Sequence, residues 1–357
     1  MATVTDVVKV ILSRRPRYFA GGMEPSDFLE VFEGLQTWDD WIKGVAHYAE
    51  ERKTLAEEAL ADNRKLSAGK YFIEAGIYYH YAMLGYYEDE KKKFALKQKS
   101  VETYHLGIGL INPPIRRLEI PYDGIEMTGH LRLPLNVTKN CPLVFLLPGA
   151  DSTKEEYFMF SDVLVTYGLG TLALEGPGQG ETRESRVMRG MADYEKAFST
   201  AVDYVIDNIK EVAPDKIGVY GRSLGGYLGP IVAAYDKRLR ALVSAGGLYD
   251  VSHWDSLGES TKNNWRHTFG FENLDEAKEY LLKEITLEGV VQKITCPFLI
   301  VHSEKDANAP ADAATRMKAE AKCEAELRIY EDGIHVCDNI PYKYQRYVAD
   351  WLLKKLR

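Results

Sequence analysis

Hydrophobic residues follow two different patterns along the chain, and the change falls near residue 112. Before it, apolar residues recur at the three- and four-residue spacing of an amphipathic helix, as in Ile73, Ile77 and Tyr81. Clear alternation of apolar and polar residues, which marks a half-buried strand, does not occur in this part. We therefore expect residues 1–111 to form a helical N-terminal domain, with residues 63–69 as a turn between two helices.

Short apolar runs separated by amphipathic segments follow from residue 113 onwards. Strands are expected at 117–121, 130–134, 142–147, 170–174, 217–220, 239–245, 297–302 and 325–330, and helices at 194–209, 226–234 and 342–356. Strands and helices that alternate over short links form a mostly parallel sheet with helices on both faces. The sequence thus predicts an α/β domain over residues 112–357. Residues 247–294 interrupt the alternation and are expected to form a small lid insertion.

A G-x-S-x-G motif, Gly221-Arg222-Ser223-Leu224-Gly225, lies between a predicted strand and a predicted helix. This is the context in which the motif forms the nucleophile elbow of an α/β-hydrolase. Glycine is needed there because the turn is tight and its backbone approaches neighbouring elements closely. We therefore predict an α/β-hydrolase fold with Ser223 as the nucleophile.

The catalytic base and acid are expected to follow the serine in the order acid, then histidine. His335 comes after the last predicted strand and before the closing helix, where the catalytic histidine of this fold belongs. Asp306 follows the strand at 297–302 and would hold the imidazole in its useful tautomer. Glu304 in the same loop is the rival acid.

An oxyanion hole needs two backbone N–H groups that point at the developing negative charge. One is expected from Leu224, directly after the nucleophile. The other is expected from the loop after the strand at 142–147, where we assign Ala150, with Gly149 as the alternative.

Overall charge, cysteine spacing and the lack of apolar targeting segments limit the kinds of partner that we expect. The 357 residues carry a net charge of −8, which argues against nucleic acid, because phosphate binding needs a basic surface. The four cysteines form no C-x-x-C pair, and no His/Cys cluster has zinc spacing, so we expect reduced thiols, no metal and no cofactor. With neither a signal peptide nor a membrane-spanning run expected, the prediction is a cytoplasmic protein without a membrane partner.

Four segments together resemble one subfamily of α/β-hydrolases. This subfamily includes 2,6-dihydroxypseudooxynicotine hydrolase, fungal polyketide chain-shortening hydrolases and relatives of the fermentation-respiration switch protein. The segments are 38–41 (WDDW), 148–156 (PGADSTKEE), 175–181 (EGPGQGE) and 221–226 (GRSLGG). The resemblance implies a helical N-terminal cap, a homodimer and the triad Ser223, Asp306 and His335. Glu175 departs from it, because the family turn usually begins with Asp.

The resemblance also bears on the reaction. Some members hydrolyse a carbon–carbon bond next to a carbonyl, and they use an acidic residue in the segment that corresponds to 249–255. We expect a serine hydrolase that acts through an acyl-enzyme on a small, largely apolar substrate. The reaction that we expect first is cleavage of a C–C bond in a β-diketone, polyketide or aryl ketone. Hydrolysis of a carboxylic ester is the second expectation. A non-catalytic regulatory binding protein is the alternative of another class. The residues expected to bind substrate are Tyr79, Tyr157, His253 and Trp254.

Overall fold

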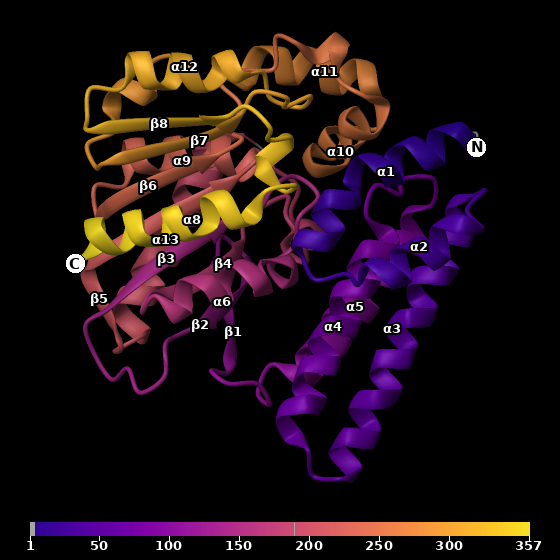
Figure 1. The fold of residues 1–357 in the computed structure, drawn as a ribbon. Helices are drawn as coiled ribbons and strands as arrows, with labels where there is room; N and C mark the ends of the chain where they lie inside the picture. The colour runs from indigo at the N-terminus through magenta and orange to yellow at the C-terminus, as the bar shows by residue number, and fades with distance from the viewer. Residues whose placement is uncertain (1–3, 189) are drawn as a thin grey trace. The chain divides into compact units, whose positions relative to one another are not determined.

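The computed structural model describes residues 4–188 and 190–357, which divide into two compact units (Figure 1). The first unit contains the chain up to Arg116 together with Glu155–Met159. The second contains Arg117–Lys154 and Phe160–Arg357, and it is called the hydrolase unit below. Each unit has its own hydrophobic core.

The first unit is helical, as the apolar spacing predicts. Its helices are α1 (Val4–Ala20), α2 (Pro25–Glu33), α3 (Trp38–Ala61), α4 (Lys65–Met83) and α5 (Glu90–Gly107). The start of α3 is fixed by a capping box, in which Thr37 and Asp40 satisfy each other's backbone N–H groups. Helix α4 packs along both α3 and α5 (Figure 1).

The predicted turn between two helices lies between α3 and α4, but it ends before Lys65, where α4 begins, rather than at residue 69. Glycine at position 69 suggests a helix break, but here it serves helix packing. A Cβ at Gly69 would lie 2.7 Å from Leu110, and one at Gly76 would lie 2.6 Å from Tyr104 of α5. Gly76 therefore allows the backbones of α4 and α5 to approach closely, and Gly69 leaves room for the chain just after α5.

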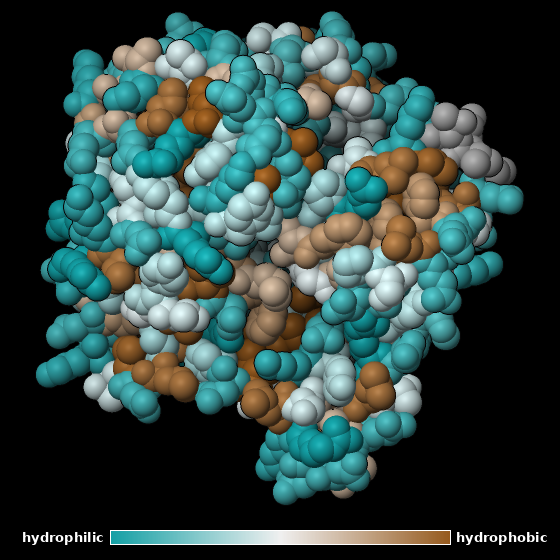
Figure 2. Space-filling view, viewed as in Figure 1, coloured by the Kyte–Doolittle hydropathy of each residue, from teal (hydrophilic) through white to brown (hydrophobic). Residues whose placement is uncertain are grey.

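Aromatic side chains fill the core of the first unit. The ring of Tyr18 lies 5.2 Å from that of Trp41 and 5.1 Å from that of Tyr81, and the Trp41 indole donates a hydrogen bond to the Tyr81 carbonyl at 3.1 Å. Other apolar side chains remain at the surface. Figure 2 shows them gathered over α1 and α2, where Phe19 and Leu29 are 36% and 58% exposed.

The hydrolase unit is built on one eight-stranded sheet (Figure 1). Its strand order is β1-β2-β4-β3-β5-β6-β7-β8. Strand β2 runs antiparallel to β4, and every neighbouring pair from β4 to β8 is parallel. The strands are β1 (Ile115–Tyr122), β2 (Ile125–Arg132), β3 (Cys141–Leu147), β4 (Gly170–Glu175), β5 (Val212–Arg222), β6 (Leu239–Ala245), β7 (Phe298–Ser303) and β8 (Ala325–Tyr330). The predicted α/β-hydrolase fold is thus confirmed.

Helices cover both faces of this sheet. The helical elements of this unit are α6 (Phe158–Thr166), α7 (Thr182–Ser185), α8 (Met191–Asn208), α9 (Leu224–Tyr235), α12 (Ala311–Glu320), η4 (His335–Cys337) and α13 (Pro341–Leu356). The short helix η1 (Lys154–Tyr157) belongs mostly to the first unit. A Cβ at Gly218 of β5 would lie 3.1 Å from Leu356 of α13, whereas Val219 faces Gly229 of α9. Because consecutive strand residues point to opposite faces, α9 and α13 lie on opposite sides of the sheet.

The segment predicted as a lid runs between β6 and β7 and is mostly helical. It contains η2 (Trp254–Ser256), α10 (Glu259–Phe269), α11 (Leu274–Glu284) and η3 (Val291–Lys293). Its apolar residues belong to the same hydrophobic core as the sheet, so the segment is packed rather than loose. Within the described residues, none of the helices has both the length and the apolar composition needed to cross a membrane.

Candidate active site

Ser223 sits on a strained turn between β5 and α9. Its backbone has φ 55° and ψ −119°, a conformation that costs a non-glycine residue about 1–3 kcal/mol. Its N–H donates to the carbonyl of Ala245 at the end of β6, which ties the turn to the neighbouring strand at 2.9 Å. Helix α9 begins at Leu224, two residues earlier than predicted, so its N-terminus starts directly at the serine.

The glycines of the motif are required by space. A Cβ at Gly221 would lie 1.9 Å from the carbonyl oxygen of Gly225, and one at Gly225 would lie 2.0 Å from the carbonyl oxygen of Leu147 at the end of β3. Real Cβ atoms do not approach backbone oxygens this closely. The turn can therefore form only where these two positions carry no side chain.

Ser223, His335 and Asp306 form one continuous hydrogen-bonded chain. The Ser223 hydroxyl lies 2.8 Å from His335 Nε2, and His335 Nδ1 lies 2.8 Å from both carboxylate oxygens of Asp306. A carboxylate can only accept, so Nδ1 carries the proton and Nε2 is left to accept the serine proton. The structure thus brings together the three residues that chain order selected.

The carboxylate of Asp306 is buried and accepts several hydrogen bonds. The side chain of Asp306 is fully buried, and Oδ1 also accepts the backbone N–H groups of Asn308 and Ala309, each at 2.9 Å. Burial by itself raises the pKa of Asp306, but the interaction with His335 and the hydrogen bond from the Ala309 N–H outweigh it and leave the pKa lowered. The rival Glu304 is exposed to solvent, so it is Asp306 that contacts the histidine.

The loop that carries His335 has an unusual backbone. Val336 and Cys337 both have positive φ, 51° and 58°, and a β-branched residue rarely adopts this region. Gly246 leaves room for the turn, because a Cβ there would lie 2.8 Å from the Val336 side chain. Burial raises the pKa of the Cys337 thiol to about 11, so this thiol stays protonated and unreactive at neutral pH.

The two backbone segments that carry the predicted oxyanion donors lie next to Ser223. Leu224 is the first residue of α9, directly after Ser223. The loop after β3 passes beside the serine, since a Cβ at Gly149 would lie 3.2 Å from Ser223 Cβ. Ala150 is the next residue of that loop.

Several residues that support the site were not found from the sequence. Gln179, which is fully buried, donates to the carbonyl of Pro148 at 2.7 Å. Arg222 of the motif forms an ion pair with Asp338 beyond the histidine, with 2.8 Å between nitrogen and oxygen. These contacts join segments 31 and 116 residues apart, so no local pattern in the sequence reveals them.

Of the four residues predicted to bind substrate, two belong to the hydrolase unit and two to the first unit. His253 Nε2 lies 2.9 Å from the carbonyl oxygen of Asn308, in the loop that carries Asp306. Trp254 is 3% exposed and packs in the core of the hydrolase unit. Tyr79 and Tyr157 belong to the first unit, where both are buried. Tyr79 there bonds to the carboxylate of Glu50.

Residues 249–255, which follow β6, contain two carboxylates, and both bind other side chains. Asp250 accepts from the backbone N–H and hydroxyl of Ser252 and from Arg316, at 2.6–3.0 Å. Burial raises the pKa of Asp250, but the hydrogen bonds lower it by more than burial raises it. The pKa is therefore lowered overall, and Asp250 is ionised at neutral pH. Asp255 is 82% exposed and pairs with Lys278 at 2.7 Å.

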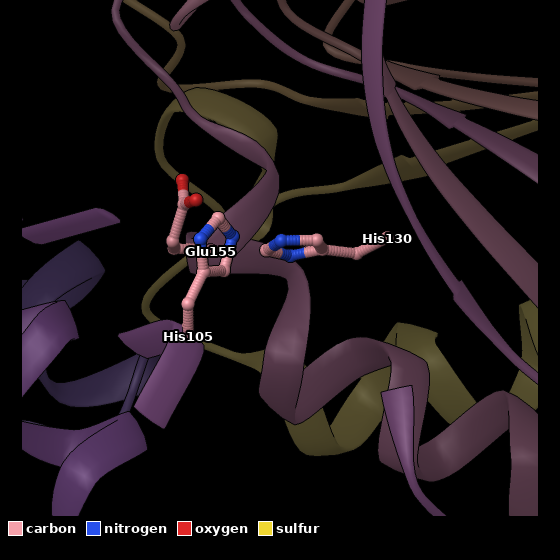
Figure 3. A group of neighbouring side chains, drawn as sticks. All are labelled: His105, His130 and Glu155. Atoms are coloured by element: carbon pink, nitrogen blue, oxygen red, sulfur yellow. The ribbon is translucent and has the colours of Figure 1, made fainter. Parts of the chain in front are cut away.

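Figure 3 shows three side chains of the kinds that bind metals. His105 comes from α5, and Glu155 comes from η1, both in the first unit. His130 comes from β2 of the hydrolase unit. Because these residues belong to different units, no metal site is assigned to them.

Comparison with known proteins identifies relatives over most of the chain. Residues 33–255 match the family model described as esterase FrsA-like, and residues 176–357 match that of the prolyl oligopeptidase family. The chain is 32% identical to 2,6-dihydropseudooxynicotine hydrolase of Paenarthrobacter nicotinovorans, over 88% of this chain and 84% of that one. A crystal structure of 2,6-dihydroxy-pseudo-oxynicotine hydrolase superposes with a TM-score of 0.88 and 30% identity, covering 96% and 95% of the two chains.

Fungal relatives are similar over a shorter stretch. The chain is 30% identical to hydrolyase poxO of Penicillium oxalicum over 69% of its own length and 60% of that protein. For α/β hydrolase gkaG of Penicillium citrinum, the identity is 29% over 65% and 57% of the two chains. These relatives support the subfamily whose motifs the sequence carries. The chain is therefore a hydrolase that belongs to the FrsA-like esterase family of the α/β-hydrolase fold.

Proposed function

We propose that the chain hydrolyses a small, largely apolar carbonyl compound through an acyl-enzyme on Ser223. The observation that carries the proposal is the hydrogen-bonded chain from Asp306 through His335 to the serine, with 2.8 Å at each step. A serine hydroxyl is a weak nucleophile unless a base accepts its proton as it attacks, and the proton on Nδ1 leaves Nε2 free for that role.

The first half of the reaction forms the acyl-enzyme. Ser223 Oγ bonds to the carbonyl carbon while His335 Nε2 takes the hydroxyl proton, and Asp306 stabilises the imidazolium. The N–H groups of Leu224 and Ala150 bind the oxyanion. When the carbonyl re-forms, the bond to the leaving group breaks, the leaving group takes the electron pair, and His335 returns the proton to it.

The second half regenerates the enzyme. Water attacks the acyl carbon and gives a proton to His335. The bond to Ser223 Oγ then breaks, the serine recovers its proton from His335, and a carboxylic acid leaves.

We propose a carbon–carbon bond of a β-diketone-type compound as the bond that is cleaved. A carbon leaving group needs a place for its electron pair. Asp250 and Asp255 are both held in other ion pairs, so neither carboxylate assists from the segment after β6. In a β-diketone the second carbonyl takes the pair as an enolate, and protonation of its carbon by His335 completes the cleavage. The substrate then supplies the stabilisation that the protein does not.

Ester hydrolysis is the second candidate, favoured by the same two ion pairs. An alkoxide or phenolate leaving group holds its electron pair on oxygen and needs no carboxylate. The similarity to the FrsA-like esterase model points the same way.

Two matched substrates distinguish the reactions. Benzoylacetone and phenyl acetate share an aromatic ring and an acetyl group, and both are followed by absorbance, with products identified by chromatography. We expect the purified chain to cleave benzoylacetone with the higher kcat/KM, and Ser223→Ala to cleave neither. Turnover of phenyl acetate alone would overturn the C–C assignment, and equal activity of Ser223→Ala would overturn the mechanism.

A further inference from the structure

Three consecutive carbonyl groups in the loop after β3 each accept a hydrogen bond. The pairs are Pro148 O with Gln179 Nε2 at 2.7 Å, Gly149 O with Ser152 N at 3.3 Å, and Ala150 O with Thr268 Oγ1 at 3.0 Å. Gly149 C=O and Ala150 N–H belong to one planar peptide group, so fixing the carbonyl fixes the direction of the N–H. The bonds on either side prevent that plane from turning.

Gln179 is itself held in place. Its side chain is fully buried, and Oε1 accepts the backbone N–H of Gly176 at 3.1 Å and the hydroxyl of Tyr194 at 2.9 Å. These two donors orient the amide, so that Nε2 is directed at the Pro148 carbonyl. The turn after β4 therefore fixes one end of the loop after β3.

Thr268 fixes the other end from the segment between β6 and β7. It lies in the last turn of α10 and is fully buried. Its carbonyl accepts the N–H of Met188 at 3.3 Å, and the preceding carbonyl, that of His267, accepts two hydrogen bonds from Arg183 at 3.2 Å. The end of α10 is thus anchored to residues 183–188, and the Thr268 hydroxyl donates its hydrogen bond to the Ala150 carbonyl.

We propose that Thr268 and Gln179 are positioning residues that hold the Ala150 N–H as an oxyanion donor, and that α10 acts on catalysis through Thr268. This inference rests on the proposed function, since it needs an oxyanion on a substrate attacked by Ser223. The segment between β6 and β7 is then a part of the catalytic machinery and does more than cover it.

The size of the effect follows from the demands of an oxyanion hole. Its donors must lie about 2.7–3.1 Å from the oxyanion, and loss of one donor costs on the order of 10²–10³ in kcat. Release of one of three anchors displaces the donor without deleting it. We therefore expect a loss of about tenfold in kcat from removing the Thr268 hydroxyl, with KM changed less than twofold, because the oxyanion exists only beyond the ground state.

The test compares three threonine variants. Thr268→Val removes the hydroxyl at nearly constant volume, and Thr268→Ser keeps it. Thr171→Val is the matched control, because Thr171 is also buried and its hydroxyl bonds to Ser161 at 2.6 Å, within the sheet and α6. For each variant, kcat, KM, the melting temperature and the rate of labelling by a fluorophosphonate are measured, since the phosphoryl oxygen of that probe also needs the oxyanion donors.

The inference predicts that Thr268→Val loses kcat and labelling rate about tenfold, that Thr268→Ser recovers most of both, and that Thr171→Val matches the wild type in both. Equal kcat and labelling rate in Thr268→Val and Thr171→Val would overturn it. So would failure of Thr268→Ser to recover activity at an unchanged melting temperature. A wild-type chain that the probe does not label would instead overturn the proposed function.

Discussion

The ion pair between Lys154 and Glu175 predicts a large stability effect. Both side chains are fully buried, with 3.2 Å between Nζ and Oε2. The carboxylate also accepts the backbone N–H groups of Lys154 and Glu181 at 2.9 Å and the Thr128 hydroxyl at 3.0 Å. Glu175 is therefore a buried carboxylate that accepts several hydrogen bonds and pairs with the ammonium group of Lys154.

Lys154→Met removes that cation at similar volume. Breaking a buried ion pair from one side costs about 3–5 kcal/mol, because the remaining charge stays buried without its partner. Glu181 also contacts Lys154 Nζ, but it keeps Arg117 at 2.7 Å. We therefore expect Lys154→Met to lower the free energy of unfolding by about 3–5 kcal/mol. Glu175→Gln should cost less, since Glu181 still pairs with the lysine.

Urea unfolding followed by circular dichroism measures these differences. Lys278→Met is the control, because its partner Asp255 is 82% exposed and the pair should contribute little to stability. The double variant Lys154→Met/Glu175→Gln should be more stable than the sum of the two single losses implies, since it leaves no unpaired charge from the pair. If Lys154→Met unfolds at the same urea concentration as Lys278→Met, the reasoning about burial is refuted.

Three further predictions concern the acid, a second histidine and the elbow. Asp306→Asn should lower kcat about 10⁴-fold with little change in KM, because Asp306 no longer holds the His335 imidazole in the tautomer with its proton on Nδ1. A loss of less than tenfold in steady-state assays would contradict the role of Asp306 as partner of the histidine. Burial lowers the pKa of His302, so the unfolded chain binds its proton more readily. Stability should therefore be full above about pH 6.5 and fall as the pH drops below it, and this fall should shrink in His302→Gln when unfolding is measured from pH 8 to 5. Gly225→Ala should abolish activity or folding, because its Cβ would meet a β3 carbonyl at 2.0 Å, whereas Gly258→Ala, with nothing within 4 Å, should match the wild type in activity and melting temperature.

The sequence predicts the centre of the candidate site better than its surroundings. Gly221 and Gly225 determine the elbow locally, and the order of strands then selects Asp306 and His335. Asp306 and Glu304 follow the same strand, and it is the hydrogen bonds of the folded chain that show Asp306 as the partner of the histidine.

Contacts between distant segments explain what the sequence does not predict. Thr268 meets Ala150 across 118 residues, and nothing in α10 marks this threonine as different from other buried ones. Gly69 suggests a helix break in the sequence, but in the structure it leaves room for Leu110, which only folding brings near. Local pattern determines where helices, strands and tight turns form, and packing determines which side chains meet.

Covalent labelling of the nucleophile tests the central claim most directly. The purified chain is treated with a fluorophosphonate and analysed by intact mass and peptide mapping, with Ser223→Ala and Ser161→Ala as matched variants. The account predicts one adduct per chain, located on Ser223, that is absent from Ser223→Ala and retained by Ser161→Ala. An unlabelled wild-type chain, or an adduct that persists in Ser223→Ala, would contradict it.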